Sequence, residues 1–174
     1  MSRSQSAPRS FLGGLWYTAL AESSGLLLAP SGESFATGSA EYFDADPGIR
    51  DPLPRIYVEF WPEGAEMSFL ALLDTGGHYC ILNTSVIEEI GEDRLVDKVG
   101  HAELRTALGL IRGDLYIHRI TLIADSGRPL GFEATVFVSP DWQGANFIGY
   151  AGALDRMCFA VNPQKSRLYF GPLG

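Results

Sequence analysis

The chain has 174 residues, enough to bury one sizeable core, and its length predicts a single domain. Its 46% hydrophobic and 20% charged residues are the proportions of an ordinary globular protein. The formal net charge of -8 argues against nucleic acid and anionic membranes as partners, because both attract basic surfaces.

The cysteines, histidines and apolar runs exclude further classes of protein. Cys80 and Cys158 are too few for a disulfide scaffold, and we expect both to be buried free thiols. The three histidines lack the spacing of a metal site, so we expect neither a metal nor a cofactor. No apolar run approaches the roughly 20 residues of a membrane span. Residues 11–20 have the outline of a weak export signal, but Gly13-Gly14 interrupts it; the sequence favours a cytoplasmic location and leaves export open.

Residues 1–53 are expected to form an N-terminal extension, and residues 54–174 the folded domain. Residues 1–10 carry Ser, Arg and Pro and predict disorder. Leu26–Leu28 is expected to be a short strand or an apolar strap on the domain. Residues 31–53 predict connecting chain with turns, because Gly, Ser, Asp and Pro recur in them.

The domain begins with strands. Alternating apolar residues over 56–60 predict a strand with one buried face, and the Pro and Gly of residues 61–64 predict a turn. The almost continuous apolar run 67–73 predicts a strand buried on both faces. Residues 80–82 predict the next strand, which leaves the turn that follows Asp74.

A helix and a long hairpin are expected next. Ser85 and Glu88 have the spacing of a capping box, and Gly91 predicts the end of the helix. A polar link over 92–100 then leads to a hairpin over 102–123, with Gly109 and Gly113 near its tip.

The remaining chain predicts a turn, further strands and a second short helix. In chain order these are a turn at 125–129, a strand at 132–138, a loop at 140–146, a helix at 150–156, and strands at 157–161 and 168–170.

One stretch points to chemistry. The apolar run Leu70–Leu73 ends in Asp74-Thr75-Gly76-Gly77, and a second apolar run follows at once. A carboxylate among apolar strands is costly unless it is hydrogen-bonded or partly neutralised, so its presence at such a turn indicates a chemical role. The structural alternative is an Asp-x-Gly turn that only ends a strand, which is common.

This stretch resembles the active-site loop of the aspartic peptidases. Asn146-Phe147-Ile148-Gly149, followed by Ala153-Leu154, is similar to the second signature of that family. Because there is one Asp-Thr-Gly, the chain resembles the single-domain, retropepsin-like branch, which is related to the retroviral proteases, over about residues 54–171. The resemblance implies a mainly β fold, a closed β-barrel with one or two short helices, that must form a homodimer for activity.

The resemblance also implies roles for individual residues. Asp74 would be the catalytic residue of each subunit, hydrolysing peptide bonds of a peptide or protein substrate with its copy in the dimer. Thr75 and Gly76 would support the active-site loop. The substrate-binding residues and the flap, a hairpin that closes over substrate, would comprise Gly77, His78, Gly109, Leu110, Ile111 and Ile148.

Several departures keep a second hypothesis open. Gly77 stands where the family usually has Ala or Ser, and His78 and Tyr150 stand where the retroviral members pair an acidic residue with an Arg. The alternative is a catalytically inactive retropepsin-like domain that serves as a peptide-binding or dimerisation module. We expect Asp125-Ser126-Gly127 to be a hairpin turn and not a second catalytic loop, because Arg128-Pro129 follows it. The substrate, cleavage preference, self-processing and pH optimum are not determined by the sequence.

Overall fold

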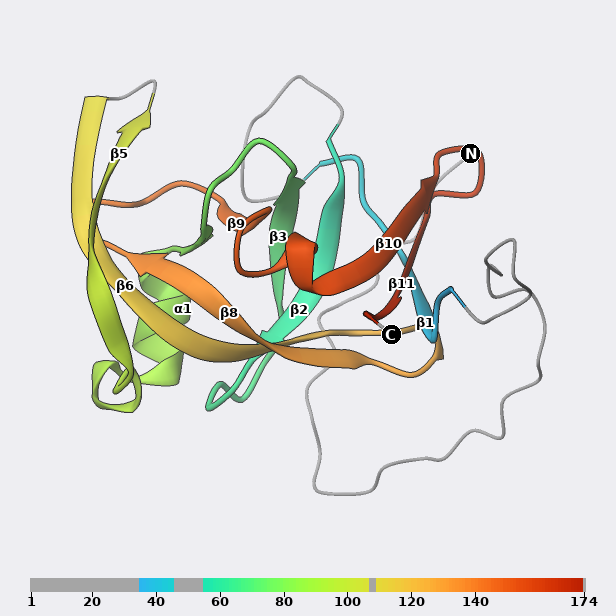
Figure 1. Cartoon of the computed structure of the whole chain (residues 1–174), viewed down its shortest axis with the longest axis horizontal. Helices are drawn as coiled ribbons and strands as arrows, with labels where there is room; N and C mark the ends of the chain where they lie inside the picture. Colours follow the sequence, from blue (N-terminus) through green and yellow to red (C-terminus); the bar gives the residue numbers. More distant parts are fainter. Residues whose placement is uncertain (1–34, 46–54, 107–108, 174) are drawn as a thin grey trace.

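A computed structural model describes residues 35–45, 55–106 and 109–173, which are mainly β with one short α-helix (Figure 1). The first half of this part contains β1 Gly38–Glu41, β2 Tyr57–Pro62, β3 Phe69–Asp74, β4 Cys80–Leu82, α1 Thr84–Ile90, the 3-10 turn η1 Glu92–Arg94, and β5 Lys98–Thr106. The second half contains β6 Gly109–Leu122, β7 Ser126–Gly127, β8 Leu130–Val138, β9 Asn146–Gly149, the 3-10 turn η2 Leu154–Arg156, β10 Met157–Asn162 and β11 Arg167–Pro172.

The strands form two sheets. Seven strands lie in the order β2-β3-β9-β4-β8-β6-β5, and β2 also pairs with β6. The other sheet has the order β10-β11-β1-β7. In the larger sheet β9 lies between β3 and β4, which are consecutive in the chain, and runs parallel to β3. This insertion brings a segment from residue 146 onward beside the end of β3.

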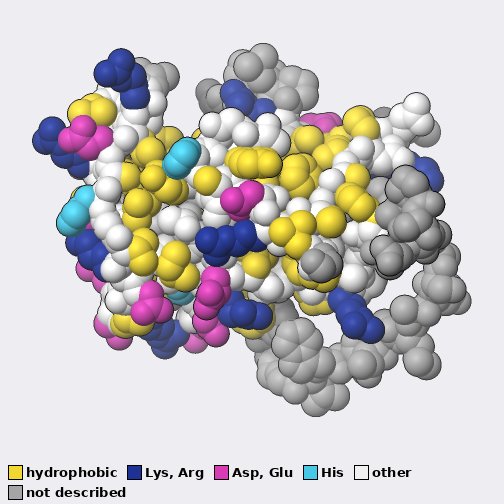
Figure 2. All heavy atoms as spheres, viewed as in Figure 1, with side chains coloured by type: hydrophobic (Ala, Val, Ile, Leu, Met, Phe, Trp, Pro, Cys, Tyr) yellow, Lys and Arg dark blue, Asp and Glu magenta, His cyan; other side chains and the backbone are white. Residues whose placement is uncertain are grey.

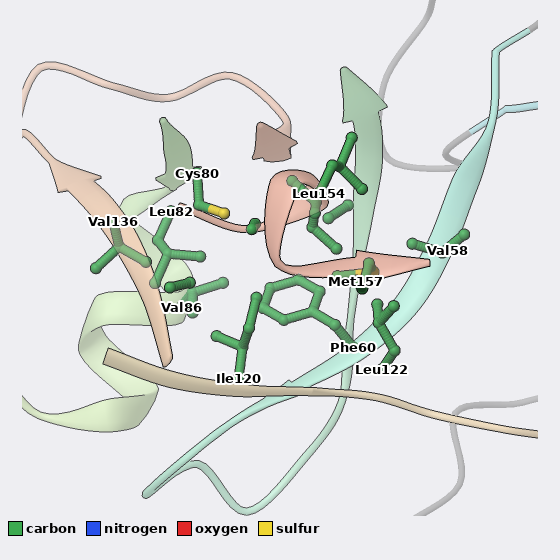
Figure 3. Packing of buried hydrophobic residues seen from close by; sticks show 14 of the residues in the cluster. Val58, Phe60, Cys80, Leu82, Val86, Ile120, Leu122, Val136, Leu154 and Met157 are labelled. Atoms are coloured by element: carbon green, nitrogen blue, oxygen red, sulfur yellow. The ribbon is translucent and has the colours of Figure 1, made fainter. Parts of the chain in front are cut away.

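The main core lies between the sheets and α1. Figure 3 shows Phe60 of β2 packed among side chains from several other elements, with Val86 reaching in from the helix. A side chain of this size stabilises the fold by about 1.5–3 kcal/mol when fully buried. Cys80 is buried in this core, whereas Cys158 is half-buried; both are free thiols.

A second, smaller core lies where the β5–β6 hairpin meets the rest of the larger sheet. It is built from Ile111, Leu115, Phe137 and Trp142, with partly buried apolar side chains around them. Among these partners are Tyr79, Ile81 and Phe147, so this cluster joins the hairpin to the segment that follows the Asp74 turn and to β9.

Two strands form where the sequence predicted only connections. Residues 38–41 were expected to be connecting chain, but they form β1 and pair with β11 and β7. Ser126–Gly127 was expected to lie in a turn and instead forms β7. Both segments are short and lack large apolar residues; each is a strand because a partner strand satisfies its backbone. The predictions for residues 1–10, 11–20 and 26–28 lie outside the described residues.

Other boundaries differ from the prediction for local reasons. The helix is capped by Asn83, whose side chain accepts from the backbone N–H of Val86, and not by Ser85. The expected polar link over 92–100 contains η1 and the start of β5. Gly113 lies within β6, opposite Ala102, and not at the hairpin tip. An added Cβ there would meet backbone and ring atoms of β8, so the glycine permits close approach of two strands.

The predicted helix over 150–156 is reduced to turns followed by η2. Gly152 adopts a φ of 83°, and its N–H donates to Asp155 Oδ1 at 2.8 Å. A left-handed residue at this position interrupts a helix after one turn. The predicted end of the helix at Gly91 is confirmed. Gly91 has a φ of 86°, and its N–H donates to the carbonyl of Ile87.

Candidate active site

The Asp74 turn is held by the aspartate itself. Asp74 ends β3, and its Oδ1 accepts from the N–H of Gly76 at 2.9 Å. Its backbone carbonyl accepts from the N–H of Gly77 at 3.1 Å. These two hydrogen bonds form a local turn at the end of β3. The Asp74 residue at this turn is half-buried. Thr75, Gly76 and His78 are exposed around it.

Strand β9 brings the second predicted motif to this turn. In the parallel pairing, Leu73 lies opposite Ile148 and Asp74 opposite Gly149. The next residue, Tyr150, donates its N–H to the carbonyl of Gly77 at 2.7 Å. Two motifs about 70 residues apart in sequence are therefore adjacent strand ends, tied by backbone hydrogen bonds.

Gly149 allows this close approach. A Cβ at this position would lie 2.2 Å from the carbonyl oxygen of Tyr79 and 3.1 Å from that of Gly77. Real Cβ atoms essentially never approach another atom closer than 3.0 Å, so only glycine fits between the loop and β9.

Asn146 joins the three strands at the other end of β9. This buried side chain donates from Nδ2 to the carbonyl of Leu70 on β3 at 3.0 Å, and its Oδ1 accepts from the N–H of Asn83 at 2.8 Å. The sequence motif contained Asn146 but did not reveal this bracing role. A buried amide with both groups satisfied fixes the spacing of the strands on either side of β9.

The predicted flap is the β5–β6 hairpin. Leu110, near its tip, is 53% exposed, and Gly109 adopts a φ of 119°, which glycine tolerates. Ile111 is instead buried in the second core. Figure 2 shows the hairpin at the upper left as an arm, separated from the body by an indentation with hydrophobic side chains along it. The hairpin therefore projects from a base that is packed against the neighbours of Asp74.

The predicted substrate-contacting residues do not all face the same space. Ile148 is 1% exposed and belongs to the main core, so it supports the Asp74 loop from within and does not line an open pocket wall. His78 is exposed and packs edge-on against Tyr79, with ring centroids 4.7 Å apart. The structure thus brings the loop residues 74–77 and Ile148 together, whereas Leu110 lies near the tip of the hairpin.

The carboxylates of the Asp-Thr-Gly and Asp-Ser-Gly sequences have different surroundings. Within the described residues, the Asp74 side chain has no cationic partner. The Asp125 carboxylate instead accepts from the N–H of Glu41 at 2.6 Å and from Arg167 at 3.0 Å. The Asp125 carboxylate therefore links β1 and β11, a structural role that differs from the hairpin turn predicted from the sequence.

Cys80, which lies close to the Asp74 loop in sequence, is a core residue and not a candidate nucleophile. Burial raises the pKa of the Cys80 thiol to about 12, because the thiolate would lose its hydration in the core. Cys80 therefore stays protonated and unreactive, as expected of a core residue.

A charged cluster lies on the hairpin away from Asp74. Asp114 Oδ2 lies 2.6 Å from Lys98 Nζ, and Oδ1 lies 2.5 Å from His101 Nδ1. The hydrogen bond from Lys98 is the largest cause of a lowered pKa of Asp114. An open cavity of about 540 Å³ borders this cluster and is lined by Glu103, Arg112, Val138 and Pro140 among others; Asp74 does not line it.

Two negative findings concern the described part of the chain. It contains no group of three or more His, Cys, Asp or Glu side chains placed to hold a metal ion. It also contains no helix long and apolar enough to cross a membrane.

Comparison with known families and with curated proteins found no match to this chain.

Proposed function

We propose that the protein is an aspartic endopeptidase that acts as a homodimer, with one Asp74 from each subunit. The observation that carries the proposal is the register of β3 and β9, which sets Asp74 opposite Gly149. The two sequence motifs that resemble aspartic peptidases meet at one point, and the carboxylate there has no counter-ion among the described residues.

The chemistry requires two carboxylates across one water molecule. Like charges about 3 Å apart cannot both be ionised at low cost, so the pair shares one proton and titrates as a unit. The ionised carboxylate takes a proton from water, whose oxygen attacks the peptide carbonyl carbon, while the protonated carboxyl donates to the carbonyl oxygen. The tetrahedral intermediate then breaks its C–N bond, and the amine leaves with a proton from the dyad.

Each subunit supplies half of this site. A C2 axis beside Asp74 would bring the two copies together, and the same operation would place two β5–β6 hairpins around a shared cleft. Closure of these hairpins would exclude water from the bound peptide. Because β2 also pairs with β6, six strands of the larger sheet are paired in a closed ring. This pairing supports the closed barrel that the resemblance implies.

A second candidate is an inactive module that binds peptides or dimerises through the same surface. It is favoured by His78 and Tyr150, because neither forms an ion pair among the described residues where the retroviral members use one. Without that ion pair, the Asp74 loop would be less firmly fixed at the dimer interface.

Turnover of a mixed peptide library by purified protein across pH, beside Asp74→Asn, tests the proposal. We expect cleavage by the wild type and none by Asp74→Asn, because the amide can neither accept the proton nor share one. Asp125→Asn is the matched control, an equivalent change in the Asp-Ser-Gly sequence, and this variant should still cleave. Equal cleavage by wild type and Asp74→Asn would refute the proposal, and no cleavage by a folded wild-type dimer would favour the inactive module.

A further inference from the structure

The backbone of Tyr150 is fixed relative to Asp74. Its N–H donates to the carbonyl of Gly77, whose own N–H donates to the carbonyl of Asp74. The carbonyl of Tyr150 accepts from Asp155 at 3.0 Å and from Ala153 at 3.3 Å. Both backbone polar groups are thus engaged, and the Tyr150 side chain projects from a rigid position two hydrogen bonds away from the aspartate.

Among the described residues, the Tyr150 side chain does not belong to a hydrophobic cluster. It is 51% exposed. The other tyrosine at this turn, Tyr79, packs in the second core on the side of the β5–β6 hairpin. A single exposed aromatic residue is ordinary on a protein surface. This one is notable because a rigid frame holds it beside half of a symmetric site.

Symmetry determines what Tyr150 faces. The inference rests on the proposed function, in which two Asp74 carboxylates lie about 3 Å apart across the axis. Neighbouring strands are about 4.8 Å apart, and Gly149 is the register partner of Asp74. With the reach of the aspartate side chain and the step from residue 149 to residue 150 added, the backbone of Tyr150 lies within roughly 14 Å of the axis.

We infer that Tyr150 is a dimer-contact residue, whose ring packs against the second copy of this chain at the edge of the Asp74 dyad. Its partner is a surface identical to its own, as an isologous interface requires. Tyrosine suits this role, because it buries a large apolar ring at low entropic cost and is enriched among interface hot spots. The contact stands where the related enzymes use an ion pair and would hold the dimer by apolar burial instead.

The charge of the chain adds a second expectation. Two subunits of formal charge -8 repel each other, and salt screens that repulsion. A dimer held by an ion pair would weaken as salt rises. A dimer held by aromatic contact is expected to keep its affinity or gain affinity over the same range.

Sedimentation equilibrium of the full chain tests this inference, with Tyr150→Ala, Tyr150→Phe and Met67→Ala compared with the wild type at low and high salt. Met67 is the matched control, because it is 40% exposed and precedes β3 at the end opposite Asp74. We expect Tyr150→Ala to weaken the dimer by about 30-fold or more, the scale of an interface hot spot. Tyr150→Phe and Met67→Ala should stay within a few-fold of the wild type.

Activity as a function of protein concentration separates the possible failures. If Tyr150→Ala recovers wild-type turnover at high protein concentration, the residue acts through assembly. If its dimer affinity is unchanged, or if only KM rises in a saturated dimer, Tyr150 is not the contact, while the peptidase proposal stands. A wild type that remains monomeric at every concentration refutes both.

Discussion

Replacing Gly149 with alanine would test how the Asp74 turn is built. The new Cβ would lie 2.2 Å from the carbonyl oxygen of Tyr79, against a closest real approach of 3.0 Å, so the strand and the loop must separate by about 0.8 Å. The obstructing atoms are backbone, and β9 is held between β3 and β4, so no side chain can move aside. Overpacking of this kind costs about 1–3 kcal/mol.

The same displacement would act on the reaction. A shift near 1 Å in a catalytic arrangement can reduce the rate by about 100-fold. For a chain of this size, at about 2–4 °C for each kcal/mol, we expect Gly149→Ala to lower the Tm by about 2–12 °C. Turnover, where the wild type shows it, should fall by about two orders of magnitude at a temperature at which the variant remains folded.

Thermal unfolding and peptide cleavage measure the two effects. Gly100→Ala is the matched control, because its Cβ would have no atom within 4 Å, and it should leave both properties close to wild type. If Gly149→Ala unfolds at the wild-type temperature and cleaves at the wild-type rate, the close contact between β9 and the Asp74 loop is not present, and the assembly of the site described above is wrong.

Three further predictions concern two buried ionisable groups, Cys80 and His118, in the larger sheet. Burial raises the pKa of Cys80 from 9.0 to about 12, so the thiol ionises at lower pH in the unfolded state than in the folded state. The free energy of unfolding should therefore decline as pH rises from 9 toward 12, and it should decline less in Cys80→Ala. Native Cys80 should also resist alkylation at pH 8 that labels Cys158; equal labelling would contradict its burial. Burial lowers the pKa of His118, which lies 3.0 Å from the carbonyl of Glu63, so the unfolded state takes up the proton first as pH falls below about 6.5. Stability against urea should therefore fall between pH 7 and 5 more steeply in wild type than in His118→Leu, and parallel curves would refute this.

The elements with a strong local signal were predictable from sequence. The apolar run before Asp74, the strand after it and the hairpin all form near the expected residues, because alternation and buried runs depend on the chain's own side chains. The Gly91 stop was predicted for the same reason, since a left-handed cap needs only the glycine.

Elements that depend on a distant partner were missed. Asn83, Thr84 and Ser85 are all residues that can cap a helix. Asn83 caps it because Asn146 accepts its backbone N–H, which holds residue 83 extended. Strand β1 likewise forms because it pairs with β11, and residues 38–41 alone do not predict a strand.

For the site, the sequence by itself determined the residue types and their local geometry: a carboxylate at the end of an apolar strand, glycines that allow a tight turn, and a second motif farther along the chain. Only the tertiary structure decided that these motifs meet, because that depends on β9 entering between β3 and β4 in one register. It also decided that Ile148 is in the core and that Tyr150 remains exposed beside Asp74. Local sequence sets which side chains can do chemistry, whereas strand order and register, which are non-local, set which of them come together.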